Sequence, residues 1–156
     1  RGLRSGTENV PAITGMGKAI KIASAEINNF YEHVMNMRKF LISEIQNKIP
    51  DTYLNGPDMD SDLCAPHIAN ISFLGIKGEI LVHALEEYGI YISTGAACSS
   101  KKTSKSHVLD VMGCSPERIE SSVRFSFSIL NTMDEVRFCV DKLIEVVKEL
   151  RSIIRR

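Results

Sequence analysis

A long apolar stripe constrains the fold of this 156-residue chain more than any other feature. From Pro11 to about Lys48, apolar side chains recur at steps of three and four residues, which is the period of one helix face. The stripe consists of Ile13, Met16, Ile20, Ile27, Phe30, Val34, Met37, Leu41 and Ile45. Pro11 suits the first turn of a helix. The pattern therefore predicts one helical segment over about residues 10–48, with a kink or break near Ser24–Asn29, where two asparagines weaken helix propensity.

Shorter patterns predict a small sheet with helices in residues 52–156. Strands are expected at Thr52–Leu54, Ile68–Leu74, Ile90–Ile92 and Ser122–Ser128. Helices are expected at Glu79–Tyr88, with Ile80, Leu81, Ala84 and Leu85 inward, at His107–Met112, and after the capping residues Ser115 and Thr132. Strands covered by amphipathic helices form two layers around one core. We expect an α+β, two-layer domain with a sheet of three or four strands.

Composition excludes some partners. The chain has 19 basic and 19 acidic residues, so it lacks the basic face that nucleic-acid binding needs. No apolar run approaches the roughly 20 residues of a membrane span. No signal peptide is evident. We therefore expect neither nucleic acid nor a membrane as a partner.

The cysteines point to a reducing compartment. Cys64, Cys98, Cys114 and Cys139 include no C-x-x-C pair and match no zinc-ligand spacing. We expect reduced thiols, no metal site and a cytoplasmic protein. The chain also begins at Arg1, within a motif and without a methionine, so we expect it to be a fragment of a longer protein.

Residues 95–106 form a polar loop that carries one reactive side chain. The loop holds small and basic residues, and its only thiol is Cys98. A loop this long in a compact domain is commonly functional or disordered. Lys101, Lys102 and Lys105 place positive charge nearby, which favours the thiolate that acts as a nucleophile. Cys98 is our first catalytic candidate, and an exposed cysteine without a function remains the alternative.

Arg124 and Thr7 are candidates for binding anions. Arg124 stands between serines on the polar face of its strand, where a guanidinium can grip a carboxylate through two parallel bonds; a surface ion pair is the alternative. Thr7 belongs to the turn-rich segment Arg4–Thr7, whose amide and hydroxyl groups suit a phosphate. An ordinary lead-in to the first helix is the alternative there.

The remaining candidates are weaker. Cys64 and His67 have a ligand-like C-x-x-H spacing but no second pair. His107 follows the loop and could act as a base for Cys98, although a residue at the start of a helix is the simpler interpretation. Cys114 and Cys139 are expected to be structural.

Three motifs in order resemble one family. They are Arg4–Asn9 followed by Gly15–Ala19, then Ser93–Ser100, then Ser121–Ser126. Together they resemble the phosphate-contacting segment, the catalytic-cysteine loop and the S-x-R-x-S strand of the pyridoxal-phosphate-dependent cysteine desulfurases, in their C-terminal part. The resemblance runs nearly from end to end of the chain. It implies the small C-terminal domain of a fold-type I enzyme.

The resemblance also implies an activity. These enzymes take sulfur from L-cysteine, release L-alanine and pass the sulfur to an acceptor or iron–sulfur scaffold protein. By resemblance, Cys98 would attack the substrate sulfur and become a persulfide, and Arg124 would hold the substrate carboxylate. Thr7 would contact the cofactor phosphate, from across the interface of a homodimer.

One departure from the family bears on activity. The family's cofactor-binding lysine follows a histidine, but His33, His67, His83 and His107 are followed by Val, Ile, Ala and Val. We therefore expect the large cofactor-binding domain to be absent and this chain to be inactive alone. Ala96 replaces a frequent serine and is expected to be tolerated. Two other functions remain open: a stand-alone persulfide carrier, and a thiol hydrolase using Cys98 and His107.

Overall fold

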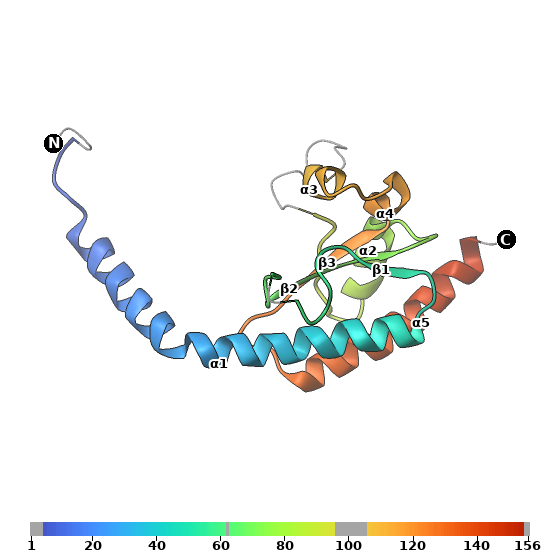
Figure 1. The fold of residues 1–156 in the computed structure, drawn as a ribbon, viewed down its shortest axis with the longest axis horizontal. Coiled ribbons are helices and arrows are strands. Elements are labelled where there is room, and N and C mark those ends of the chain that lie inside the picture. The colour runs from blue at the N-terminus through green and yellow to red at the C-terminus, as the bar shows by residue number, and fades with distance from the viewer. Residues whose placement is uncertain (1–4, 62, 96–105, 155–156) are drawn as a thin grey trace.

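The computed structural model describes residues 5–61, 63–95 and 106–154. Five helices and three strands follow one another in this part of the chain (Figure 1). They are α1 (Val10–Lys48), β1 (Thr52–Leu54), β2 (Ile68–Phe73), α2 (Gly78–Glu86), α3 (His107–Val111), α4 (Pro116–Glu120), β3 (Ser122–Ser126) and α5 (Met133–Ile154). The predicted α+β class is confirmed.

The sheet is antiparallel with the order β1-β2-β3. Leu54 pairs with Ile71, and Ile71 pairs with Val123, so these side chains share one face because strand residues alternate between faces. This apolar face packs against the helices, and Figure 1 shows α1 and α5 running side by side along it. Asn70, Ser72 and Arg124 alternate onto the opposite, polar face. The sheet therefore has one apolar face, which joins the core, and one polar face.

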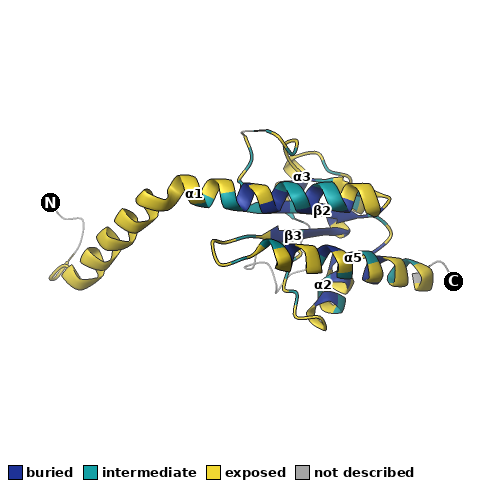
Figure 2. Ribbon diagram, turned by 90° about the horizontal axis from the view of Figure 1, so that it is seen from below, coloured by how far each residue is buried: buried dark blue, intermediate teal, exposed yellow. Residues whose placement is uncertain are grey.

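Only the second half of α1 enters the core. Its buried side chains begin at Val34 and include Leu41, Ile42 and Ile45, whereas Ile13 and Ile20 in the first half are 52% and 57% exposed. Figure 2 shows this change from exposed to buried along the helix. The expected disturbance near residues 24–29 is not a break, since the helix is continuous from Val10 to Lys48. Figure 1 shows a change of direction in its blue part instead.

The predicted strand at Ile90–Ile92 is wrong. The helix α2 is followed by Gly89 at φ 73°, and the Ile90 N–H donates to the Leu85 carbonyl at 3.1 Å. This Schellman-type ending is typical of glycine at the end of a helix. The backbone of Ile90 is thus used to close α2, and sheet pairing starts only at a single bridge between Ser93 and Arg124.

The inward face predicted for α2 is also partly wrong. Leu81 and Leu85 are fully buried, but Ile80 is 43% exposed. The helix begins so close to β3 that a Cβ at Gly78 would lie 2.5 Å from the Ser122 carbonyl oxygen. This close approach orients Gly78, Leu81 and Leu85 toward the sheet and leaves Ile80 at the surface.

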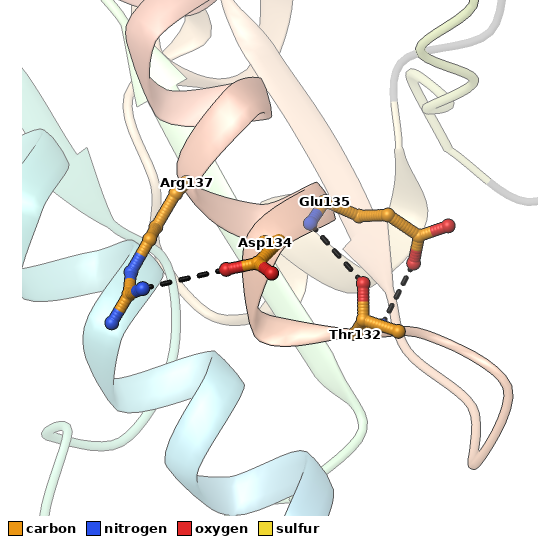
Figure 3. Close-up of polar contacts among 4 residues, drawn as sticks. All are labelled: Thr132, Asp134, Glu135 and Arg137. Atoms are coloured by element: carbon orange, nitrogen blue, oxygen red, sulfur yellow. Dashed lines mark hydrogen bonds and ion pairs between the residues drawn. The ribbon is translucent and has the colours of Figure 1, made fainter.

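The capping box predicted for the last helix is confirmed. The Thr132 N–H donates to Glu135 Oε2 at 2.8 Å, and the Glu135 N–H donates to Thr132 Oγ1 at 3.3 Å (Figure 3). These two reciprocal bonds satisfy backbone donors that a helix start leaves free. The cap fixes the start of α5, whose buried residues Val136, Val140 and Leu143 join the core.

In the ranges described, no helix combines the length and the apolar composition needed to cross a membrane.

Candidate functional site

Arg124 lies at the middle of β3, on the polar face of the sheet. Its N–H donates to the Ser93 carbonyl at 2.6 Å, and its carbonyl accepts from the Ser93 N–H at 3.2 Å. On the other side of β3, its register partner on β2 is Asn70. Arg124 is therefore held between a regular strand and the residues that lead into the segment containing Cys98.

The side chain of Arg124 carries a polar atom without a partner. Its Nε is buried and has no hydrogen bond within the described residues. A guanidinium offers only donors and stays charged, and leaving a buried donor unsatisfied costs about 1–3 kcal/mol. The cross-strand neighbour, Asn70, is neutral, so the surface ion pair considered for Arg124 is not found in the described part of the chain. The geometry leaves the guanidinium available for an anion.

A polar network supports the same face of the sheet from the other edge. Arg118 donates through Nε to Asn55 Oδ1 at 3.1 Å and through an Nη atom to the Leu54 carbonyl at 3.0 Å. Asn55 donates through Nδ2 to Asn70 Oδ1 and to Ser72 Oγ, each at 2.7 Å. The fully buried Ser72 hydroxyl then donates to the Arg118 carbonyl at 2.7 Å. The network joins α4, the end of β1 and β2 with satisfied bonds, which fixes the orientation of its side chains.

Sequence reasoning missed this network. Asn55 directly follows the strand expected at Thr52–Leu54, Arg118 lies in the helix expected after Ser115, and neither was a site candidate. A signal was present in β2, where Asn70 and Ser72 alternate with apolar residues and so share a face. The role of Asn55 had no local signal, because its partners are far away in sequence.

Cys98 lies outside the described residues, as do Lys101, Lys102 and Lys105. The structure does describe the approach to that segment. Ser93 bonds to Arg124, and the Thr94 side chain lies against the position of Gly78, where a Cβ would be 3.1 Å from Thr94 Cγ2. The catalytic role of Cys98 stays a prediction, but the chain enters its segment directly beside Arg124.

The structure does not bring Thr7 to this site. Thr7 is exposed in the segment before α1, and Asn9 caps that helix by accepting from the Ala12 N–H at 3.1 Å. Figure 1 shows the N-terminal part of α1 extending away from the sheet. A contact between Thr7 and a group bound near Arg124 of the same chain is therefore not made.

The other cysteines and histidines form no second site in the ranges described, where no three His, Cys, Asp or Glu side chains could hold a metal ion. Cys114 lies at the polar network, with Sγ 3.9 Å from Asn55 Oδ1. Burial raises the pKa of the Cys139 thiol to about 12, which suits a structural role. The His67 ring packs 6.3 Å from that of Phe30, and His107 is exposed at the start of α3.

Comparisons with known proteins agree on one family. The chain is 37% identical over 150 residues to a cysteine desulfurase IscS of Dictyoglomus turgidum, covering 96% of this chain and 37% of that protein. It is 40% identical to the cysteine desulfurase IscS of Methanosarcina thermophila, covering 96% of this chain and 36% of that protein. A solved NifS-like protein superposes with a TM-score of 0.76 at 32% identity, over 95% of this chain and 36% of that one.

The chain thus spans a little over a third of the length of these relatives. Residues 1–138 match the family described as aminotransferase class-V. This match includes β3 with Arg124 and the whole segment from Ser93 to Ser106. The chain belongs to the aminotransferase class-V family.

Proposed function

We propose that the protein containing this chain is a cysteine desulfurase, which converts L-cysteine to L-alanine and holds the sulfur as a persulfide on Cys98. The observation that carries the proposal is the buried Nε of Arg124, which has no partner within the described residues. An arginine without an internal acceptor is suited to a carboxylate, which accepts two parallel N–H bonds from a guanidinium. Two relatives that are 37% and 40% identical to this chain are named cysteine desulfurases.

In this proposal Arg124 holds the substrate carboxylate. Its backbone is fixed between Asn70 on β2 and Ser93, and its Nε is buried, so the strand positions the guanidinium before a ligand binds. Positioning of this kind lowers the entropic part of a reaction barrier. The substrate would lie on the polar face of the sheet, with its thiol directed toward the segment of Cys98.

Cys98 would take the sulfur. It follows Ser93 by five positions in the sequence, and a span of five residues reaches at most about 18 Å. The Cys98 thiolate attacks the substrate sulfur, the carbon–sulfur bond breaks with its electrons moving to carbon, and that carbon gains a proton. Alanine and a persulfide result, without a net oxidant or reductant.

The cofactor implied by the family is pyridoxal phosphate, which supplies an electron sink for the bond cleavage when it is bound. No histidine in this sequence is followed by the lysine that the family uses to bind it. Thr7, the expected phosphate contact, is exposed, and it precedes the part of α1 that extends away from the sheet (Figure 1). The proposal therefore places the cofactor-binding lysine in another part of the full-length protein. Thr7 would contact the cofactor phosphate in the site of a second copy, within a homodimer.

The sulfur would then pass from Cys98 to an acceptor, such as a scaffold protein for iron–sulfur cluster assembly. The cysteine pattern, which has no C-x-x-C pair, suits the cytoplasm. Both the acceptor and the compartment are part of the proposal.

The test uses the full-length protein with L-cysteine and measures alanine and protein persulfide together. Cys98→Ser should abolish both products, whereas Cys64→Ser, which alters a cysteine of the loop before β2, should leave both unchanged. A normal rate of alanine release from the Cys98→Ser protein would contradict the proposal. Persulfide that forms on Cys98 only when a separate desulfurase is added would indicate a carrier instead. Ester or amide hydrolysis without the cofactor would indicate a hydrolase.

A further inference from the structure

Asn70 occupies the central strand between the polar network and Arg124. Its backbone carbonyl accepts from the Asn55 N–H at 2.8 Å, whereas the backbone of Arg124 bonds to Ser93 on the far edge of β3. Asn70 and Arg124 thus face each other as a non-hydrogen-bonded pair. In such a pair the side chains lie close together, with Cβ atoms about 4.5–5.5 Å apart. Both side chains stand on the polar face of the sheet.

The direction of the hydrogen bonds in the network is set by Arg118. A guanidinium donates only, so Asn55 must present Oδ1 to it and turn Nδ2 away. Asn55 Nδ2 then donates to Asn70 Oδ1 at 2.7 Å. The Asn70 amide is thereby fixed with its oxygen toward β1, and its Nδ2 is left as a donor that has no recorded partner within the described ranges.

Two donors therefore stand at paired positions on the polar face, and neither has an acceptor within the described residues. One is Asn70 Nδ2, and the other is the guanidinium of Arg124, whose Nε is buried and unpaired in the part of the chain that is described. Neighbouring donors do not satisfy each other. A group with two acceptor oxygens would satisfy both, and a carboxylate is such a group.

We propose that Asn70 Nδ2 is a second donor to the carboxylate that Arg124 binds, and that Arg118 and Asn55 are positioning residues that keep the Asn70 amide in this orientation. The inference rests on the proposed function for the identity of the ligand as an amino acid. It assigns to β2 and α4 a part in substrate recognition. The orientation of the Asn70 amide favours ligands that carry a carboxylate. An amide turned the other way would direct its oxygen at the carboxylate and repel it.

The experiment compares three variants of the full-length protein. Asn70→Asp keeps the shape but replaces the donor with a carboxylate, Asn70→Ala removes the donor, and Asn55→Asp keeps an acceptor for Arg118 but cannot donate to Asn70. Asn47→Ala is the matched control, since Asn47 is exposed on α1 and its side chain donates to Ser43 at 3.3 Å, outside the network. Kinetics with L-cysteine are measured together with the affinity for L-alanine and for ethylamine, which lacks the carboxylate.

A hydrogen bond to a charged group corresponds to about a 10- to 100-fold change in affinity. We expect Asn70→Ala to raise KM for L-cysteine and Kd for L-alanine by at least about tenfold. Asn70→Asp should raise both constants further. Asn55→Asp should give values between those of the two Asn70 variants. The change should fall on KM more than on kcat, and ethylamine binding should not respond. Asn47→Ala should match the unaltered protein in every measurement.

The two proposals can fail separately. If the unaltered protein releases alanine and folded Asn70 variants bind L-alanine normally, the inference about Asn70 is overturned and the activity stands. If the unaltered protein does not turn over cysteine but binds L-alanine in a manner that depends on Asn70, the activity is wrong and the carboxylate site stands. Equal losses for L-alanine and ethylamine would indicate a structural role and overturn the inference. Circular dichroism identifies any variant that does not fold, and Asn55→Asp then gives the result.

Discussion

Arg124 is proposed to bind the substrate, but its side chain lowers the stability of the folded chain. Its buried Nε has no partner in the described part of the chain, so the folded state carries the cost of an unsatisfied donor. Methionine has a similar length and no polar hydrogen to satisfy. We expect Arg124→Met to raise the free energy of unfolding by about 1 kcal/mol while it abolishes binding of L-cysteine. Urea denaturation and substrate titration of the full-length protein measure the two effects.

The control for this substitution is Arg137→Met. Arg137 is exposed on α5 and lies 3.4 Å from Asp134, a surface ion pair of the kind that contributes little. Arg137→Met should change neither the free energy of unfolding nor the binding of L-cysteine. A large loss of stability in Arg124→Met would show that the guanidinium already has its partner in the unliganded protein.

Cys139 should react with alkylating reagents far more slowly in the native state than after denaturation. Burial raises the pKa of its thiol from 9.0 to about 12, and only the thiolate reacts. At pH 8 the native thiolate fraction is therefore about a thousandfold smaller than in the unfolded chain. Mass spectrometry after timed treatment with iodoacetamide, with and without urea, measures the ratio. Equal rates in both states would contradict the assignment of Cys139 as a structural residue.

At the scale of elements, α5 depends on its capping box. The backbone N–H of Thr132 lowers the pKa of Glu135, so the ionised carboxylate stabilises the folded state. This contribution is present above the ordinary pKa of 4.5 and is lost as the pH falls through the lowered value. Glu135→Gln should therefore flatten the decline in stability on acidification, and Thr132→Ala should cost about 1 kcal/mol at neutral pH. Thermal unfolding from pH 3 to pH 7 tests both.

A matched control exists one residue away from Glu135. Asp134 lies in the same helical turn, but its side chain pairs with Arg137 rather than with the cap (Figure 3). Asp134→Asn should leave the profile between pH 3 and pH 5 closer to that of the unaltered protein than Glu135→Gln does. If the two variants behave alike, general charge rather than the cap explains the pH dependence.

The start of α2 should tolerate only glycine. A Cβ at Gly78 would lie 2.5 Å from the Ser122 carbonyl oxygen, which belongs to β3 and cannot move as a flexible side chain could. Gly78→Ala should displace α2 from β3 and disturb Thr94, which leads into the segment of Cys98. We expect a loss of about 1–3 kcal/mol together with reduced activity. Gly15→Ala, at a position with open space, is the control and should not destabilise.

Most elements could be predicted from the sequence because they follow local rules. The period of α1, the alternation in β3 and the caps at Ser115 and Thr132 are signals within a few residues of the elements that they define. Ile90–Ile92 failed because strand formation there depends on where the chain leaves α2. That point is decided by the backbone bonds around Gly89, and an apolar run cannot reveal it.

The candidate site was only partly predictable for the same reason. The position of Arg124 on the polar face of a strand could be predicted from its flanking serines and apolar neighbours, and its role in binding stays a prediction. Asn55 and Arg118 were missed because their contact joins residues 63 positions apart. Long-range polar contacts have no local period, so only the folded chain reveals them.

At the scale of the whole molecule, α1 extends one apolar stripe across two environments. Its members recur every seven residues, as Ile13, Ile20, Ile27, Val34 and Leu41. Val34 and Leu41 are buried in the core, whereas Ile13, Ile20 and Ile27 are 52%, 57% and 55% exposed. A contiguous exposed apolar stripe is typical of a surface that another protein surface covers. The seven-residue spacing of apolar side chains is the same in both halves of α1. The exposed half is therefore suited to pack against a helix or a sheet, as the buried half does.

The 156-residue chain should therefore self-associate when it is studied alone. Replacing Ile13, Ile20 and Ile27 together with glutamine should reduce this association in sedimentation velocity while it leaves the unfolding of the body unchanged, since none of the three lies in the core. The control replaces Val111, Ile129 and Ile153, which are 73%, 55% and 61% exposed but lie on α3, in the connection before α5 and on α5. Because only the α1 residues form a continuous stripe, the control should associate as the unaltered chain does. Equal association of both triple variants would show that total exposed apolar area, rather than the stripe on α1, drives the contact.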